Sequence, residues 1–388
     1  MVSQSAAPLT QDRVLARVLV RLVASRARKH SGIPQPGMHF DDFDTLTLGP
    51  NSPTTYSKLS VTGKAAVELA MAALAGDERL EGVTEDTMAR WLALWHAHSV
   101  AIETPMMEVT GTGVYPYAAM VNHDCEPNSC LAFHGPILEL RAMEPLTEGS
   151  PITREVTRLS AQPRHRRQQV IGERFGVNEC GCRRCSEPLE ESDVDQFMVA
   201  VLCQTVDCSG YALLPTGLVR PEDELVCLEC DKVAADRQRV DALIKSIHAF
   251  DASDLARMAT VCDEAMDLLH PLNSHLVFLL DQMQNAYLSQ SGGPDIPHAL
   301  HYCKLTLTAY EDLCPEYDCS MAFRYFVLAQ LLLESDEADA VKASREALRK
   351  ATNVMAVAQG ESGVELVVSM CEDQGMLDAH ERKQAADA

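Results

Sequence analysis

The sequence predicts an α+β protein in which a short, cysteine-rich β part lies between helical parts. Three observations predict this class. Apolar residues recur at helical spacing over residues 11 to 30, 59 to 101 and from about 240 onward. Short apolar segments broken by Gly and Pro occupy about 102 to 153, as expected for short strands. Nine of the 14 cysteines lie between Cys125 and Cys230, and none precedes Cys125.

Composition limits the kinds of partner. At 388 residues and 46% hydrophobic content, the chain suits a globular protein of two or three domains. A net charge of −23 argues against direct nucleic-acid binding and favours basic peptides, although solvation of an acidic surface is the alternative. No apolar run has the length of a membrane span and no secretory signal is seen, so we expect a cytoplasmic and/or nuclear protein without a membrane partner.

The first segment, residues 11 to 30, has two interpretations. Arg13, Arg17 and Arg21 share one face at i, i+4 and i+8, which indicates a structural helix. The same arginines lie among Val, Leu, Ala and Ser with a single acidic residue, as in an organelle transit peptide. The second segment, 59 to 101, is predicted helical from two apolar stripes: Val67, Ala70, Met71 and Leu74, then Met88, Trp91, Leu92 and Trp95.

The cysteines follow in two groups with metal-ligand spacing. Cys180, Cys182 and Cys185 form a CxCxxC run, which presents three sulfurs to one ion; unmetallated thiols in a surface loop are the alternative. The second group resembles a zinc ribbon, against buried free thiols, and consists of Cys203, Cys208, Cys227 and Cys230. Four cysteine ligands leave no open coordination position, so the zinc ion of the second group would be structural, as would that of the first group once a fourth cysteine completes it.

Two regions complete the pattern. Residues 163 to 175 are predicted helical, before the CxCxxC run. After residue 240 the chain is predicted helical to about 373, and turns near Gly292, Pro315 and Gly360 indicate an array of helical hairpins.

Two motifs together resemble one family. The run from Asn122 to Asn128, NHDCEPN, resembles the NHxCxPN signature of SET-domain lysine methyltransferases, and CxCxxC resembles their post-SET zinc motif. Gly113, Tyr115 and Pro116 before the first motif, and the RVLARVL run near the N-terminus, resemble the SET and MYND (SMYD) branch, as do residues of the helix before the second motif: Pro163, Arg167, Ile171 and Phe175.

The resemblance implies a SET-type irregular β core with inserted helices, a post-SET zinc site, a zinc ribbon and a helical, TPR-like C-terminal domain. The implied domains are a helical insert at 1–101, the C-terminal half of the SET core with the post-SET motif at 102–188, the ribbon at 197–235 and the helical domain at 240–376.

The resemblance also implies functional residues. Cys125 would complete the first zinc site with Cys180, Cys182 and Cys185. Asn122 and His123 would contact S-adenosyl-L-methionine, and Tyr115 would line the channel for a lysine side chain of a protein or peptide, including basic, histone-like ones. The alternatives are that Asn122 and His123 satisfy a structural pseudoknot and that Tyr115 is a core aromatic.

Several departures leave the activity open. The family's reactive-centre Tyr lies in a strand, and the resemblance implies that the corresponding strand here is Ile152-Thr-Arg-Glu-Val156. Val156, at the position of the Tyr, can neither donate nor accept a side-chain hydrogen bond. The glycine-rich cofactor loop and the MYND finger are not in the sequence. We therefore expect either a lysine methyltransferase whose reading frame lacks an N-terminal third, with a GxG loop and a MYND pattern encoded upstream, or a non-catalytic, zinc-stabilised interaction scaffold. A zinc-ribbon nucleic-acid binder is disfavoured by the charge.

Overall fold

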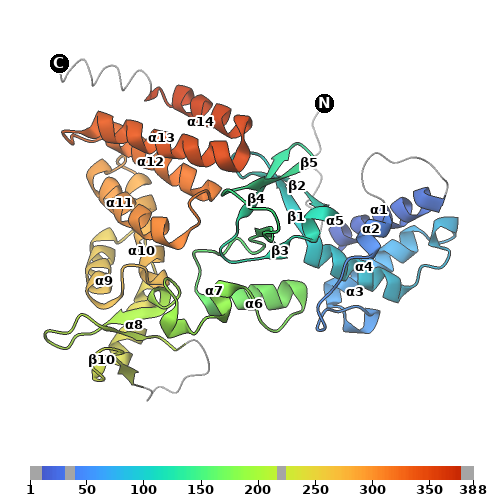
Figure 1. The fold of residues 1–388 in the computed structure, drawn as a ribbon, viewed down its shortest axis with the longest axis horizontal. Helices are drawn as coiled ribbons and strands as arrows, with labels where there is room; N and C mark the ends of the chain where they lie inside the picture. The colour runs from blue at the N-terminus through green and yellow to red at the C-terminus, as the bar shows by residue number, and fades with distance from the viewer. Residues whose placement is uncertain (1–10, 31–39, 216–223, 377–388) are drawn as a thin grey trace. The chain divides into compact units, whose positions relative to one another are not determined.

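The computed structural model describes residues 11–30, 40–215 and 224–376 (Figure 1). These residues fall into two compact units. The first comprises residues within Met1–Asn122 and Gln168–Cys180, and the second comprises residues within His123–Arg167 and Gly181–Ala388. The boundaries between the units fall at Asn122 and Cys180, the first residues of the NHDCEPN and CxCxxC motifs.

The first unit is mainly helical and contains one β-hairpin. Its elements are α1 (Gln11–His30), α2 (Phe40–Asp44), η1 (Tyr56–Lys58), α3 (Val61–Ala73), η2 (Glu78–Leu80), α4 (Glu85–His98), β1 (Ser99–Glu103), β2 (Val109–Val114), α5 (Pro116–Ala119) and the later part of α6 (Arg164–Phe175). The Ser60 hydroxyl accepts from Gly63 N–H at the start of α3, and Thr84 with Thr87 forms a capping box at α4. Local sequence therefore sets where these helices begin.

Helix α1 is a structural element of this unit. Leu19 and Val23 are fully buried in a core that also contains Val67, Met88 and Trp91. The helical interpretation of residues 11 to 30 is therefore confirmed. Removing this apolar stripe from water stabilises the unit by roughly 1.5 to 3 kcal/mol per large side chain.

One boundary of the helical prediction was wrong. The region expected to be helical up to residue 101 leaves the helix at His98, and Ser99–Glu103 forms strand β1. Val100 pairs with Gly113, and Ile102 with Gly111, in an antiparallel ladder. β-Branched side chains favour a strand, and this ladder outweighs the helical periodicity before it.

The second unit contains a small sheet of four strands in the order β3-β6-β4-β5. The strands are β3 (Asn122–His123), β4 (Ser129–His134), β5 (Ile137–Ala142) and β6 (Thr153–Arg154). β4 pairs antiparallel with β5 and parallel with β6. The predicted strand from Ile137 is confirmed.

The strand expected over residues 152 to 156 is shorter than predicted. Only Thr153 and Arg154 pair, because the Glu155 carboxylate accepts hydrogen bonds from the backbone N–H groups of Thr157, at 2.8 Å, and Arg158. Arg158 has a φ of 60°, in the left-handed region. The chain therefore bends over residues 156–158, and Val156, at the start of the bend, is buried.

The cysteine-bearing part of this unit consists of short helices and two small two-stranded sheets, in which β7 pairs with β8 and β9 pairs with β10. The elements are α7 (Arg183–Ser186), η3 (Leu189–Glu191), η4 (Phe197–Val199), β7 (Ala200–Leu202), β8 (Tyr211–Leu213), β9 (Leu225–Val226) and β10 (Val233–Ala235). Val201 and Leu225 share a buried core with Leu269.

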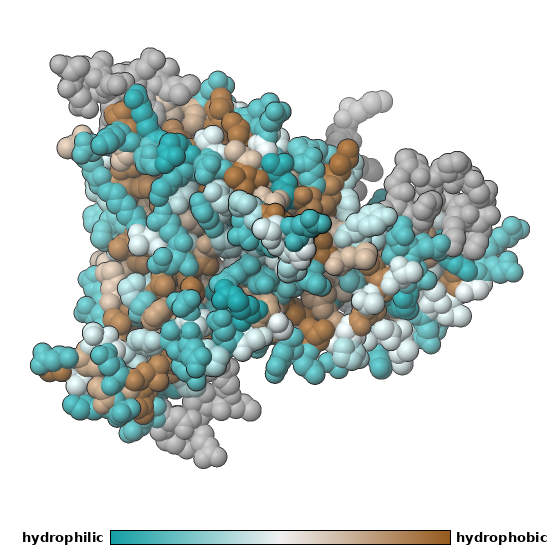
Figure 2. Space-filling model, viewed as in Figure 1, coloured by the Kyte–Doolittle hydropathy of each residue, from teal (hydrophilic) through white to brown (hydrophobic). Residues whose placement is uncertain are grey.

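The C-terminal region is all-helical, as predicted, with helices α8 (Arg237–His248), α9 (Leu255–Leu268), α10 (Ser274–Leu288), α11 (Ile296–Leu313), α12 (Cys319–Glu334), α13 (Ala340–Gln359) and α14 (Glu361–Asp373). Acidic or amide N-caps begin most of them, such as Asn273 before α10 and Asp318 before α12. On the face shown in Figure 2, hydrophilic and hydrophobic residues are interspersed over these helices. No helix of the described residues has the length and apolar character needed to cross a membrane.

One helix of this region is tied to the four-stranded sheet by an arginine. Arg141 on β5 donates from Nε to the Val357 carbonyl at 2.9 Å and from Nη2 to the Ala356 carbonyl at 3.3 Å. These carbonyls belong to the last turn of α13, where a cation also interacts favourably with the helix dipole. The C-terminal helices and the sheet therefore form one body within this unit. The predicted α+β class is confirmed.

Candidate metal centres and cofactor segment

The first cluster gathers around the NHDCEPN segment. His123, Cys125, Cys180 and Cys182 each offer one ligand atom, and these atoms lie within 4.8 Å of one another. Three of the four predicted ligands are therefore together. The fourth, Cys185, is adjacent: its Sγ lies 3.6 Å from Cys125 Sγ. The cluster offers five donors for the four positions of tetrahedral zinc.

His123 is a candidate metal ligand that was not predicted from the sequence. Its Nε2 lies 3.2 Å from Cys125 Sγ, and its Nδ1 accepts from Val156 N–H at 3.4 Å. Burial lowers the pKa of His123, which favours the neutral imidazole. Because Nδ1 accepts from Val156 N–H, the proton of that neutral form is on Nε2, which then donates to Cys125 Sγ; binding a metal through Nε2 requires the other tautomer. The strand ends at His123 and Cys125 lies in the bend that follows, so the closeness of His123 in sequence to Cys125 was the available signal.

The second cluster consists of the predicted four cysteines, Cys203, Cys208, Cys227 and Cys230, with their sulfurs all within 4.8 Å of one another. Two backbone groups turn toward this cluster: Gly210 N–H donates to Cys208 Sγ, and Glu229 N–H donates to Cys227 Sγ, both at 3.4 Å. A Cβ at Gly210 would lie 2.7 Å from Cys227 Sγ, so only glycine fits there. The donor set fits a closed, structural zinc site.

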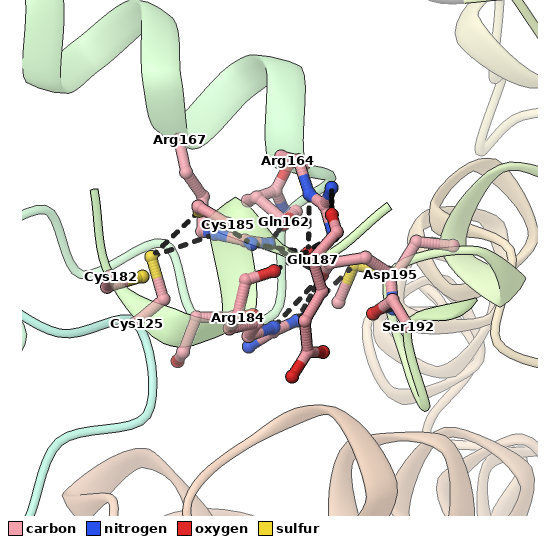
Figure 3. Close-up of polar contacts among 12 residues, drawn as sticks. Cys125, Gln162, Arg164, Arg167, Cys182, Arg184, Cys185, Glu187, Ser192 and Asp195 are labelled. Carbon is pink, nitrogen blue, oxygen red and sulfur yellow. Dashed lines mark hydrogen bonds and ion pairs between the residues drawn. The ribbon is translucent and has the colours of Figure 1, made fainter. Parts of the chain in front are cut away.

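A buried ion network adjoins the first cluster (Figure 3). Arg167 donates to Asp195 at 2.9 and 2.6 Å, Arg184 donates to the same carboxylate at 3.0 and 2.6 Å, and Arg164 does so at 3.2 Å. Arg167 also donates from Nε to Cys125 Sγ at 3.2 Å and from Nη2 to Cys185 Sγ at 3.4 Å. The network therefore links the sulfurs to a carboxylate in the segment after the CxCxxC run.

The protonation states within this network are fixed by the pairing. Burial alone would lower the pKa of Arg167, but the hydrogen bonds and charge of Asp195 outweigh it and raise that pKa. Burial alone would raise the pKa of Asp195, but Arg167 and Arg184 hold it below its ordinary value. Both groups stay charged inside the protein.

The two asparagines of the NHDCEPN segment have different environments. Asn128 is used internally: its Nδ2 donates to the Pro151 carbonyl at 2.9 Å, and its Oδ1 accepts from Thr153 N–H at 2.8 Å. Asn122 is exposed, and its side chain makes no hydrogen bond within the described parts of the chain. Asn128 therefore ties this segment to residues 151 and 153, and Asn122 does not take part in that pairing.

Tyr115 and His98 lie in the first unit. The Tyr115 ring packs on Gly113, where a Cβ would come within 2.9 Å of the ring, which explains the glycine before Tyr-Pro. Burial raises the pKa of Tyr115, so its phenol is neutral near physiological pH. His98, the last residue of α4, has its Nε2 2.7 Å from the Thr47 carbonyl and contacts Phe175 edge-on. His98 therefore has structural partners.

Together, the NHDCEPN segment, the two cysteine clusters and the C-terminal helices resemble those of SMYD-type SET-domain proteins. Comparison with known proteins finds the same resemblance. The chain is 23% identical to the histone-lysine N-methyltransferase ASHR1 of Arabidopsis thaliana over 69% of this chain and 55% of that protein. It is 22% identical to the N-lysine methyltransferase SMYD2 of Gallus gallus over the same shares, 69% and 55%.

A third relative has a higher identity over a shorter stretch. The chain is 31% identical to the histone-lysine N-methyltransferase SMYD3 of Mus musculus over 25% of this chain and 22% of that protein. No family model matches the chain. The resemblance to SMYD-type lysine methyltransferases is thus confirmed over most of the chain, and the chain spans about half the length of the first two relatives.

Proposed function

We propose that this chain binds S-adenosyl-L-methionine through the Asn122 segment and takes part in methylating lysine side chains of proteins. The observation that carries the proposal is the exposed Asn122 side chain beside the internally paired Asn128. An amide that the fold does not use can donate to or accept from a ligand. Relatives that are named as lysine methyltransferases support a role in lysine methylation.

Methyl transfer from the cofactor to a lysine amine requires few protein side chains. The cofactor supplies the methyl group, and the protein aligns it with a lysine amine that has lost its proton from an ordinary pKa near ~10.4. Asn122 would bind the cofactor, and Tyr115 would line the lysine channel. The zinc ions would be structural. The charge of −23 favours basic substrates, histone or non-histone, in the cytoplasm and/or the nucleus.

The test is isothermal titration of S-adenosyl-L-methionine into the zinc-loaded chain. We expect binding that weakens in Asn122→Ala by roughly ten- to a hundredfold, because a hydrogen bond to a charged ligand group contributes about 1.5 to 3 kcal/mol. Asn285→Ala, at an exposed asparagine of α10, is the matched control and keeps the affinity. An unchanged affinity in Asn122→Ala, or no binding by the parent chain, contradicts the proposal.

A second candidate function has its own observation. At the position where the family resemblance expects a tyrosine, Val156 is buried and aliphatic. This favours a non-catalytic scaffold for basic peptides. The measurement is fluorescence anisotropy of a labelled lysine-rich peptide, with and without S-adenosyl-L-methionine. Peptide binding with no cofactor binding in the titration supports the scaffold, and peptide methylation detected by mass spectrometry excludes it.

A further inference from the structure

The buried network beside the first cluster contains more positive than negative charge. The side chains of Arg167 and Asp195 are 0% exposed, and those of Arg184 and Arg164 are 5% and 14% exposed. Among the described residues, Asp195 is the carboxylate that these guanidiniums contact. Three positive charges therefore share one negative charge. Arginine does not deprotonate in proteins, so an excess of two positive charges stays buried.

Such an excess needs an anionic neighbour. Leaving a buried charge uncompensated costs several kcal/mol. The Arg167 contacts point to where the neighbour lies: Nε and Nη2 face the sulfurs of Cys125 and Cys185, at 3.2 and 3.4 Å. A guanidinium only donates, and a thiolate is a far better acceptor than a thiol.

Zinc provides the matching charge. A zinc ion with four thiolates carries a net charge of minus two, whereas three thiolates and a neutral histidine give minus one. The four-thiolate centre balances the network, and the centre with His123 does not. The two sulfurs that Arg167 contacts include Cys185, the donor that lies just outside the tightest grouping.

We propose that Arg167, held in place by Asp195, is a positioning residue for the first metal centre, where it compensates the Cys125 and Cys185 thiolates and selects Cys185 over His123 as a ligand. The metal affinity of this centre then depends on a side-chain pair that does not touch the metal. The second cluster, where backbone N–H groups of Gly210 and Glu229 face the sulfurs, is independent of that pair. The proposal holds whether or not the chain is an enzyme.

Arg183 supplies the control. It lies between Cys182 and Cys185 of the metal-binding motif, but its side chain is 68% exposed and pairs with Glu126 and Glu187 at the surface. An effect of removing a positive charge near the motif in general would appear in both Arg167→Met and Arg183→Met. An effect specific to the sulfur contacts would appear only in Arg167→Met.

The experiment follows zinc transfer from the full chain to a chromogenic chelator. In Arg167→Met and Asp195→Asn we expect one zinc equivalent to be bound about ten- to a hundredfold more weakly, the usual effect of losing a partner of a metal ligand. The other equivalent is unchanged, and both are unchanged in Arg183→Met. Arg167→Lys keeps the positive charge but not the guanidinium contacts, and we expect its affinity to lie between those of Arg167→Met and the parent. If Arg167→Met does not fold, Arg167→Lys serves as the test variant.

Cobalt substitution reports the ligands directly. The thiolate-to-cobalt charge-transfer absorbance counts sulfur ligands, so we expect His123→Ala to keep the full intensity and Cys185→Ser to lose a share of it. Equal weakening of both zinc equivalents in the Arg167 variants, or parent-like affinity in Arg167→Met, would overturn the role of Arg167. Full intensity in Cys185→Ser with a loss in His123→Ala would overturn the ligand selection.

Discussion

The two cysteine clusters resemble each other in ligand type and differ in how the protein supports them. In the first, Cys125 and Cys185 are 60 positions apart, and a buried guanidinium faces both sulfurs. In the second, Cys203 and Cys230 are 27 positions apart, and backbone N–H groups face the sulfurs. A local cluster can use the turns of its own loop for support. A non-local cluster requires particular side chains from elsewhere in the chain.

The largest expected effect is metal removal, because structural zinc contributes on the order of 10 kcal/mol to folding in small zinc domains. With a strong chelator we expect amide exchange to rise over 200–215, over 224–235 and around 123–125 and 181–186, while the N-terminal core around Leu19 and Met88 keeps its protection. Hydrogen exchange with mass spectrometry measures this. Uniform loss of protection in all helices would show that the two clusters are not separate supports.

Asp195→Ala comes next. The substitution leaves three buried guanidiniums without their carboxylate, so we expect a loss of about 3 to 5 kcal/mol in the free energy of unfolding. Denaturant unfolding of the zinc-loaded chain measures it. Asp193→Ala, two residues away and exposed, is the control and should stay within about 0.5 kcal/mol of the parent. A small effect of Asp195→Ala would mean that the network is open to water.

Gly210→Ala should have a smaller effect, confined to the second cluster. The added Cβ would lie 2.6 Å from Glu229 Cβ and 2.7 Å from Cys227 Sγ, and such overpacking costs about 1 to 3 kcal/mol. We expect weaker binding of one zinc equivalent, with the other unaffected, in the chelator assay. Ser209→Ala, at an exposed neighbour, serves as control. Weakening of both equivalents would contradict the independence of the clusters.

The smallest effect is expected for Arg183→Ala. This exposed arginine contributes surface ion pairs to Glu126 and Glu187, which are usually worth about 0 to 1 kcal/mol and are screened by salt. Thermal unfolding at low and high salt should show a difference from the parent only at low salt, if at all. A large loss at both salt concentrations would place Arg183 in the metal support together with Arg167.

The difference between the local second cluster and the non-local first cluster also explains which features could be predicted from the sequence. The ligands of the second cluster follow from spacing alone, and the helices follow from apolar periodicity. Asp195 could not be found, because it lies in a stretch without regular periodicity, and only the fold brings it to Arg167 and Arg184. The end of β6 was misplaced for a similar reason, since the Glu155 side chain, and not a backbone propensity, turns the chain.

The Arg141 contacts have a consequence for folding during synthesis. This strand residue is bonded to carbonyls 215 and 216 positions further along the chain. A ribosome that has completed the sheet and both cysteine clusters has not yet made the helix that Arg141 binds. Domains generally fold as units while the chain emerges, and unfinished surfaces are prone to misassembly. The side of the nascent sheet that binds the helix therefore stays exposed until α13 has left the ribosome.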